Sequence, residues 1–273
     1  KFNYIPWKKS ILELHNPKNI KKKGNFLSRL IFDEILSTFL INSKVRKNIK
    51  KIKKKNKKFD NKEFFKIKKK IDFDLTKDQL NALDQINNDL KSNQKMFRLL
   101  QGDVGSGKTI VALISSINVI SSGFQVCFMA PTEILARQHY DLALKLLDKN
   151  VNIKLLTGKT DYKDRKKILT DLNNNKTNFL IGTHSLFQEK IKYNNLGLII
   201  IDEQHKFGVK QRKKLSDKGG DNCDVLVMSA TPIPRTMIMT VFGDMDTSII
   251  KNKPKNRKEI KTYSKLESKI SEV

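Results

Sequence analysis

The chain has 273 residues, of which 38% are hydrophobic, so it is long enough to bury a substantial core. Lysine and arginine number 55 against 28 aspartate and glutamate residues, and the formal net charge of +27 argues against cationic partners and favours nucleic acid, a nucleotide or an anionic membrane surface. Two distant cysteines, Cys127 and Cys223, exclude a disulfide framework and a four-ligand zinc site, and no apolar stretch reaches the roughly 20 residues of a membrane span, so we expect a cytoplasmic protein.

The first 72 residues differ from the rest of the chain, because about two thirds of the net positive charge lies before residue 71. Residues 1–25 carry two prolines and the lone Trp7 without periodicity, and we interpret them as the end of a preceding domain. Between residues 26 and 40, apolar residues recur every three or four positions, which predicts a helix with one buried face. We therefore expect residues 1–72 to hold the end of one domain and a basic helical linker.

Residues 46–70 read RKNIKKIKKKNKKFDNKEFFKIKKK and are the most basic part of this linker. One interpretation is a basic stripe that follows a phosphate backbone, because each neutralised phosphate releases counterions. The other is a solvated helical face, since lysine, asparagine and isoleucine are over-used throughout the chain, as an AT-rich genome would produce. The sequence leaves both interpretations open.

An alternating α/β pattern begins near residue 73. Short apolar runs predict strands over Phe97–Leu100, Gln125–Ala130, Ile153–Leu156, Asn178–Ile181, Leu196–Ile201 and Val225–Met228. Helical periodicity predicts helices over Lys77–Leu90, Lys108–Ser121, Ile134–Leu147 and Asp161–Leu172. Because the runs are apolar at consecutive positions, they suit parallel strands covered on both faces. We expect a doubly wound α/β sheet of roughly six strands, with ligands at the carboxyl ends of the strands.

A glycine-rich segment follows the first predicted strand and leads into a helix. It reads Gly102-Asp103-Val104-Gly105-Ser106-Gly107-Lys108-Thr109 and matches the phosphate-loop pattern G-x-x-x-x-G-K-[ST]. The glycines let successive backbone N–H groups turn toward an anion at the helix N-terminus. We expect Lys108 to bind the β- and γ-phosphates of ATP and Thr109 to supply a hydroxyl to Mg²⁺. In this strand-to-helix setting, a chance glycine turn is the weaker explanation.

Two adjacent acids, Asp202 and Glu203, follow the apolar run 198–201. A parallel sheet would place them beside the phosphate loop, where Asp202 would hold Mg²⁺ through a water. Glu203 would orient and deprotonate the attacking water. Adjacent carboxylates repel each other without a cation, which the metal supplies. An acidic surface turn would explain the pair taken alone, and the phosphate loop makes the catalytic interpretation the stronger one.

Six segments together carry a family resemblance. They are LTKDQ (75–79), LLQGDVGSGKTIVA (99–112), MAPTEILARQHY (129–140), IGTHSLFQE (181–189), IIIDEQHKFGVKQR (199–212) and MSATPIPRTM (228–237). In this order they resemble superfamily 2 helicases and, among these, the RecG family, which remodels stalled forks and Holliday junctions in DNA recombination and repair. RLIFDEIL (29–36) is similar to the segment joining that family's DNA-binding wedge to its motor. The resemblance implies a RecA-like P-loop NTPase fold and an ATP-dependent 3′-to-5′ DNA helicase.

The resemblance also assigns roles outside the two ATP motifs. Gln79 would read adenine with its amide, and the alternative is an ordinary helical glutamine after the N-cap Thr76. Residues at strand ends would bind DNA phosphates, and these are Thr132, Thr157, Gly158, Thr183 and His184. Four residues would couple the ATP site to the DNA, and these are Gln204, His205, Ser229 and Thr231.

We divide the chain into the linker region, a RecA-like ATP-binding domain over residues 73–256 and the start of a connection over 257–273. Motors of this family have a second RecA-like lobe that supplies an arginine finger, and no strand-helix pattern follows Pro254. We therefore expect a piece of a longer monomeric protein that needs the second lobe in cis. Alone, the chain should bind ATP weakly, hydrolyse it poorly and not unwind DNA, because an arginine finger is worth several orders of magnitude in rate.

Two alternatives to a RecG-type motor stay open. The transcription-repair coupling factor, a DNA translocase, shares GDVGxGKT and SATPIPRT, but its acidic box usually reads DEEQRFG where this chain has DEQHKFG (202–208). Lys206 also departs from the RecG family, where this position is commonly arginine. The lysine keeps the positive charge but cannot form the bidentate hydrogen bonds of arginine. From a different class, a non-catalytic module would bind nucleic acid through its basic segment while the nucleotide only stabilises it.

Overall fold

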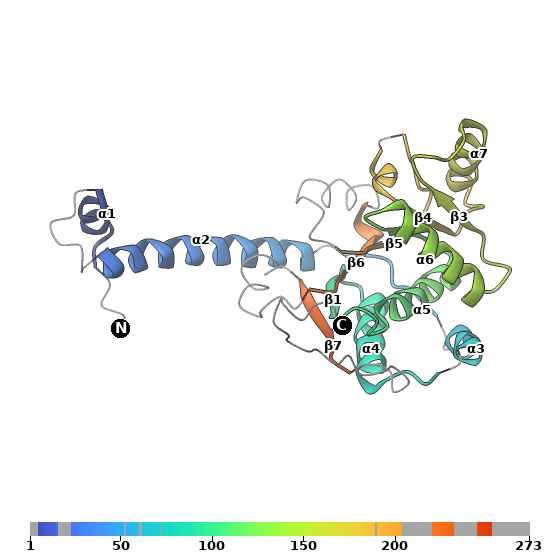
Figure 1. Ribbon diagram of the computed structural model, residues 1–273, viewed down its shortest axis with the longest axis horizontal. Coiled ribbons are helices and arrows are strands. Elements are labelled where there is room, and N and C mark those ends of the chain that lie inside the picture. The colour runs from blue at the N-terminus through green and yellow to red at the C-terminus, as the bar shows by residue number, and fades with distance from the viewer. Residues whose placement is uncertain are drawn as a thin grey trace, which may run out of the picture.

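The computed structural model describes residues 5–15, 23–51, 53–59, 62–71, 73–188, 190–203, 220–231 and 245–252. The described body is built on a seven-stranded sheet with the strand order β3-β4-β2-β5-β6-β1-β7. Every pairing in this sheet is parallel. Figure 1 shows the sheet flanked by helices. The predicted doubly wound α/β fold is thereby confirmed.

All six predicted strands are present, with ends that differ from the predictions by at most two residues. They are β1 (Phe97–Gly102), β2 (Gln125–Met129), β3 (Ile153–Leu156), β4 (Phe179–Gly182), β5 (Leu196–Ile201) and β6 (Asp224–Ser229). A further strand, β7 (Asp246–Ile250), pairs with β1 at the edge of the sheet and was not predicted. Its first three residues are polar, so β7 lacks the apolar run that marks the other strands. Buried Ser248 is satisfied by hydrogen bonds with Arg98 and Gln85.

The four predicted helices of the body are also present, each within one residue of its predicted ends. They are α4 (Lys77–Lys91), α5 (Lys108–Ser121), α6 (Glu133–Leu146) and α7 (Tyr162–Asn173). A shorter helix, α3 (Lys62–Lys70), packs against α5, and single 3₁₀ turns span η2 (His184–Phe187) and η4 (Gly220–Asn222). α4 begins with a capping box in which Thr76 and Gln79 each accept the other's backbone N–H.

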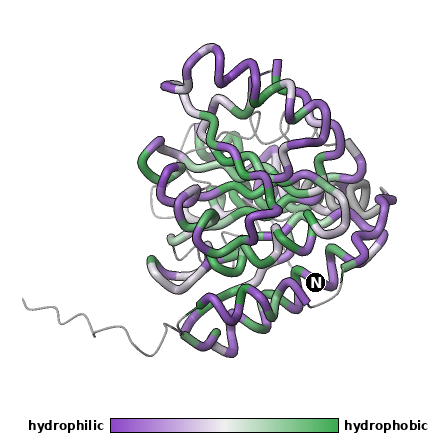
Figure 2. The backbone as a smooth tube through the Cα atoms, turned by 90° about the vertical axis from the view of Figure 1, so that its right-hand side faces the viewer, coloured by the Kyte–Doolittle hydropathy of each residue, from purple (hydrophilic) through white to green (hydrophobic). Residues whose placement is uncertain are grey.

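Each face of the sheet has its own apolar core, because side chains alternate between faces along a strand. Leu100 and Phe128 belong to the core that packs under α3, α4, α5 and α6. Their neighbours Leu99 and Cys127 belong to the opposite core, which includes residues of α7 and η2. Figure 2 shows the hydrophobic backbone segments gathered inside the body. Burial on both faces explains why the strands are apolar at consecutive positions.

Two helices precede the body. α1 (Trp7–His15), which was not predicted, contacts α2 (Lys23–Lys51), and Figure 1 shows α2 extending away from the sheet. The helix predicted over residues 26–40 is confirmed as part of α2, but the expected burial of its apolar face is wrong for most of the described side chains. Leu40, for example, is 59% exposed, because α2 leads away from the core of the body. No helix among the described residues is both long and apolar enough to cross a bilayer.

The extended segment 53–59, which we call the basic strap, lies against the end of α4 and the start of β6. Lys54 and Lys57 turn inward, with exposures of 6% and 1%, and each ammonium group donates to Asp224 at 2.6 Å. Asp224 also accepts the Met96 backbone N–H at 2.7 Å. Burial lowers the pKa of Lys54, while the charge of Asp224 opposes that shift. These two lysines are thus buried ion-pair partners, which neither interpretation of residues 46–70 anticipates.

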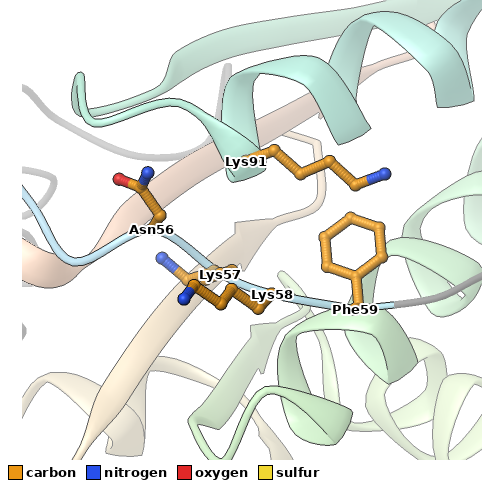
Figure 3. A pocket seen from close by; sticks show the side chains of 5 residues that line it. All are labelled: Asn56, Lys57, Lys58, Phe59 and Lys91. Atoms are coloured by element: carbon orange, nitrogen blue, oxygen red, sulfur yellow. The ribbon is translucent and has the colours of Figure 1, made fainter.

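The strap also lines a shallow hollow of about 460 Å³ (Figure 3). Lys91 of α4 reaches across it, with its ammonium group 4.7 Å from the centre of the Phe59 ring. Because Asp224 begins β6, the strap and its hollow lie at the amino ends of the strands. Ligands of doubly wound sheets bind at the carboxyl ends, so this hollow is not the nucleotide site.

Replacing Asp224 with asparagine is expected to destabilise the fold by roughly 3–5 kcal/mol, the usual cost of removing one partner of a buried ion pair. Two buried lysines would lose their carboxylate. The matched control is Asp221→Asn, since Asp221 is an exposed residue of η4 three positions earlier. Denaturant unfolding compares the two variants, and equal stability would contradict the anchoring role of the strap.

Candidate functional site

The phosphate loop (residues 102–109) connects the carboxyl end of β1 to the N-terminus of α5. Gly105 and Gly107 have left-handed φ angles of 76° and 89°, which side chains with a Cβ rarely adopt. A Cβ on Gly107 would overlap Nε2 of Gln79, and one on Gly102 would lie 2.9 Å from a backbone carbonyl oxygen of β7. The loop therefore needs glycine to fit between α4 and β7.

Lys108 is the first residue of α5, and its ammonium group lies inside the loop. Nζ donates to the carbonyl oxygens of Gly102 at 2.5 Å and Asp103 at 3.0 Å. Burial lowers the pKa of Lys108, while the charges of Glu203, Asp202 and Asp103 act in the opposite direction. The structure thus brings both acids of the predicted pair within electrostatic reach of the phosphate-loop lysine.

Two hydroxyls of the loop suit a triphosphate and its metal. Ser106 Oγ is buried and has no hydrogen-bond partner among the described residues, which a phosphate oxygen would supply. Thr109 is half-buried in the first turn of α5, where the N-terminal N–H groups and the helix dipole favour an anion. The residues present therefore fit ATP with Mg²⁺.

Asp202 and Glu203 follow the carboxyl end of β5. The Asp202 backbone N–H donates to the carbonyl of Met129 at 2.9 Å, and its buried carboxylate oxygen Oδ2 lies 2.8 Å from His139 Nε2. Glu203 has a φ of 51°, in a left-handed region that non-glycine residues seldom adopt outside turns and functional sites.

The segment after β6 lies between the two ATP motifs, since β6 separates β5 from β1 in the sheet. The hydroxyls of Ser229 and Thr231 are 2.9 Å apart, and the side-chain amide of Gln101 donates to the Thr231 carbonyl at 3.1 Å. Ser229 and Thr231 are thus tied to the end of β1. Gln204 and His205, the other two predicted coupling residues, lie outside the described residues.

Gln79 is fully buried and its amide has two protein partners. Its oxygen accepts the Thr76 N–H at 2.8 Å, and Nε2 donates to the Ser106 carbonyl at 2.7 Å. Both the capping role and a contact with the phosphate loop are therefore present. Contact with adenine stays a prediction.

The predicted DNA contacts follow three neighbouring strands, in the sheet order β3-β4-β2. Thr132 follows β2 and caps α6 by accepting the Leu135 N–H, Thr157 and Gly158 follow β3, and Thr183 and His184 follow β4. Thr157 is buried, Thr183 is half-buried, and the other three are exposed. All five lie at the carboxyl edge of the sheet that also carries the phosphate loop.

Sequence reasoning missed His139, which contacts Asp202 from α6. Sequence reasoning assigned roles to His184 and His205 but none to His139. A usable signal existed, because the helical spacing puts His139 on the same face as Ala136, Ala143 and Leu146, and this face is buried. A buried imidazole needs a polar partner, and the acid pair was the available one.

A sequence model of the DEAD/DEAH box helicases matches residues 76–240, and the chain belongs to this family. Family membership implies that the chain uses ATP. The chain is 44% identical over 281 residues to the ATP-dependent DNA helicase RecG of Aquifex aeolicus, with 100% of this chain and 36% of that protein covered. It is 43% identical over 265 residues to RecG of Borreliella burgdorferi, with 96% of this chain and 38% of that protein covered.

A solved structure of RecG bound to a three-way DNA junction matches 97% of this chain and 36% of that one, with a TM-score of 0.83 and 38% sequence identity. These matches confirm the resemblance to RecG and disfavour the coupling-factor alternative. The chain spans little more than a third of the length of these relatives.

Gly107→Ala is expected to weaken nucleotide binding about tenfold, which corresponds to about 1.4 kcal/mol, because its Cβ would be strained and would displace Gln79 from the loop. The matched control is Gly123→Ala, since Gly123 has a similar φ of 82° but open space around it. Titration with a fluorescent ATP analogue measures the nucleotide affinity of both variants. Equal nucleotide affinity in the two variants would contradict the described fit of the loop.

Proposed function

We propose that this chain is the first motor lobe of an ATP-dependent DNA helicase of RecG type, which remodels branched DNA such as stalled forks and Holliday junctions. The observation that carries the proposal is the position of the phosphate loop after β1 and of Asp202 and Glu203 after β5, at the same edge of the parallel sheet. The names of the relatives support helicase activity, and the junction bound by the matched RecG structure supports branched DNA as the substrate.

In the proposed reaction the phosphate loop binds the triphosphate through Lys108, Ser106 and the N–H groups that begin α5. Thr109 would hold Mg²⁺ directly and Asp202 would hold it through a water. When bound, the metal neutralises charge on the phosphates. Glu203 would accept a proton from the attacking water.

The DNA would run along the half of the same sheet edge formed by β3, β4 and β2. Hydroxyl and backbone N–H donors at the ends of these strands suit phosphate oxygens, so this contact would be insensitive to base sequence. Thr132, Thr157, Gly158, Thr183 and His184 would supply it. Ser229 and Thr231, with Gln204 and His205, would couple DNA binding to hydrolysis, since β6 lies between the two ATP motifs.

A second RecA-like lobe would complete the motor in the full-length protein. The relatives are nearly three times as long as the matched region, which leaves room for such a lobe and for a DNA-binding wedge. The second lobe would supply an arginine finger, and we propose that the complete protein works as a cytoplasmic monomer.

Two substitutions in the full-length protein test the proposal, one through ATP binding and the other through ATP turnover. Lys108→Ala should weaken ATP binding itself, because the loop loses its cation. Glu203→Gln should retain ATP binding and lower turnover roughly 10²- to 10⁴-fold, the usual contribution of a general base. Nucleotide titration and ATPase assays with forked DNA and with linear duplex of equal length measure both effects.

The control variant is Glu63→Gln, which makes the same chemical change on α3, outside the site. We expect forked DNA to stimulate the parent enzyme more than linear duplex does. Intact ATP affinity after Lys108→Ala, or unchanged turnover after Glu203→Gln, would refute the assigned ATP site. Equal stimulation by the two DNA forms would refute only the preference for branched DNA.

A further inference from the structure

The side chain of His139 lies against the acid pair, and none of the roles proposed above uses it. His139 is 8% exposed on α6, and its Nε2 lies 2.8 Å from Oδ2 of Asp202. Both side chains are about nine-tenths buried, so water competes little for the contact. The bond joins α6 directly to the residue that follows β5, 63 positions later in the chain.

The chemistry of the contact fixes its direction. An ionised carboxylate can only accept hydrogen bonds, so Nε2 of His139 must carry the hydrogen that it donates to Asp202. The ring of Phe128 packs against the imidazole with 4.7 Å between ring centres, which restricts rotation of the histidine. A hydrogen bond to Oδ2 from a ring held in this way fixes the orientation of the whole carboxylate.

Packing alone does not account for this arrangement. His139 occupies a core-facing position of α6 between Ala136 and Ala143, where an apolar side chain would fill the same space. The imidazole instead directs a polar atom at Asp202. Residues that hydrogen-bond a metal ligand typically change metal affinity or activity 10- to 100-fold when they are removed.

We propose that His139 is a positioning residue for Asp202, holding its carboxylate in the orientation that binds the Mg²⁺ of bound ATP. The inference rests on the proposed function, which assigns the metal role to Asp202. It adds a second link between the DNA and ATP sites, because α6 begins after Thr132, a proposed DNA contact, and carries His139 two turns later. A shift of α6 on DNA binding would thus move the partner of a metal ligand.

The test compares three His139 variants of the full-length protein. His139→Leu removes the donor, His139→Asn moves it too far from Asp202, and His139→Gln retains an N–H near the position of Nε2. The readout is the ratio of affinities for a fluorescent ATP analogue with Mg²⁺ and with EDTA. We expect the Leu and Asn variants to lose roughly 10- to 100-fold of the Mg²⁺-dependent gain in affinity and the Gln variant to recover most of it.

Two controls separate positioning from packing. Gln138→Leu, on the exposed side of the same helix, should leave the ratio unchanged. Combining His139→Asn with Asp202→Asn should give no larger loss of the Mg²⁺-dependent gain than Asp202→Asn alone, because His139 acts through that residue. Additive losses, a ratio unchanged in both the Leu and Asn variants, or a Gln variant as defective as the Asn variant would overturn the proposal.

Failure of this inference is distinguishable from failure of the proposed function. If Lys108→Ala leaves nucleotide affinity intact, the ATP site itself is wrong, whatever the His139 variants show. If Lys108→Ala abolishes binding while the His139→Leu and His139→Asn variants match the parent, the ATP site stands and the positioning role is refuted.

Discussion

Burial of the Lys108 ammonium group is the constraint on which the rest of the site depends. A lysine taken out of water loses hydration, and its pKa falls unless nearby groups compensate. Two loop carbonyls accept its hydrogen bonds, and the charges of Asp202 and Glu203 oppose the shift. A bound triphosphate would add negative charge beside this ammonium group, and a metal ion held by Asp202 would offset the negative charge of the acids. The site is thus suited to a ligand that combines a negatively charged triphosphate with a positively charged metal ion.

The parallel sheet makes this arrangement possible because it collects the ends of distant segments at one edge. The phosphate loop, the acid pair, the Ser229 and Thr231 hydroxyls and the predicted DNA contacts all follow the carboxyl ends of strands. The opposite edge has a structural role. There the basic strap buries Lys54 and Lys57 on Asp224, which ties the segment after α2 to the start of β6.

The sequence was sufficient for the elements whose patterns depend on local chemistry. Consecutive apolar residues identified β1 to β6, and the glycine-lysine spacing identified the loop, since few other structures require that combination. The sequence did not predict β7, because Asp246, Thr247 and Ser248 are polar and are stabilised by partners distant in sequence. The burial of Lys54 and Lys57 also depends on long-range pairing, which composition and periodicity do not report, whereas the helical spacing of α6 does indicate that His139 is buried.

The central claim is that a triphosphate binds in the phosphate loop and shares a divalent ion with Asp202. It is tested most directly by a crystal structure of the full-length protein with a non-hydrolysable ATP analogue and Mn²⁺, whose anomalous signal locates the metal. The account predicts a manganese peak bonded to Thr109 and joined to Asp202 by one water, with Lys108 on the terminal phosphates. A nucleotide outside the loop, or a metal remote from Asp202, would contradict it.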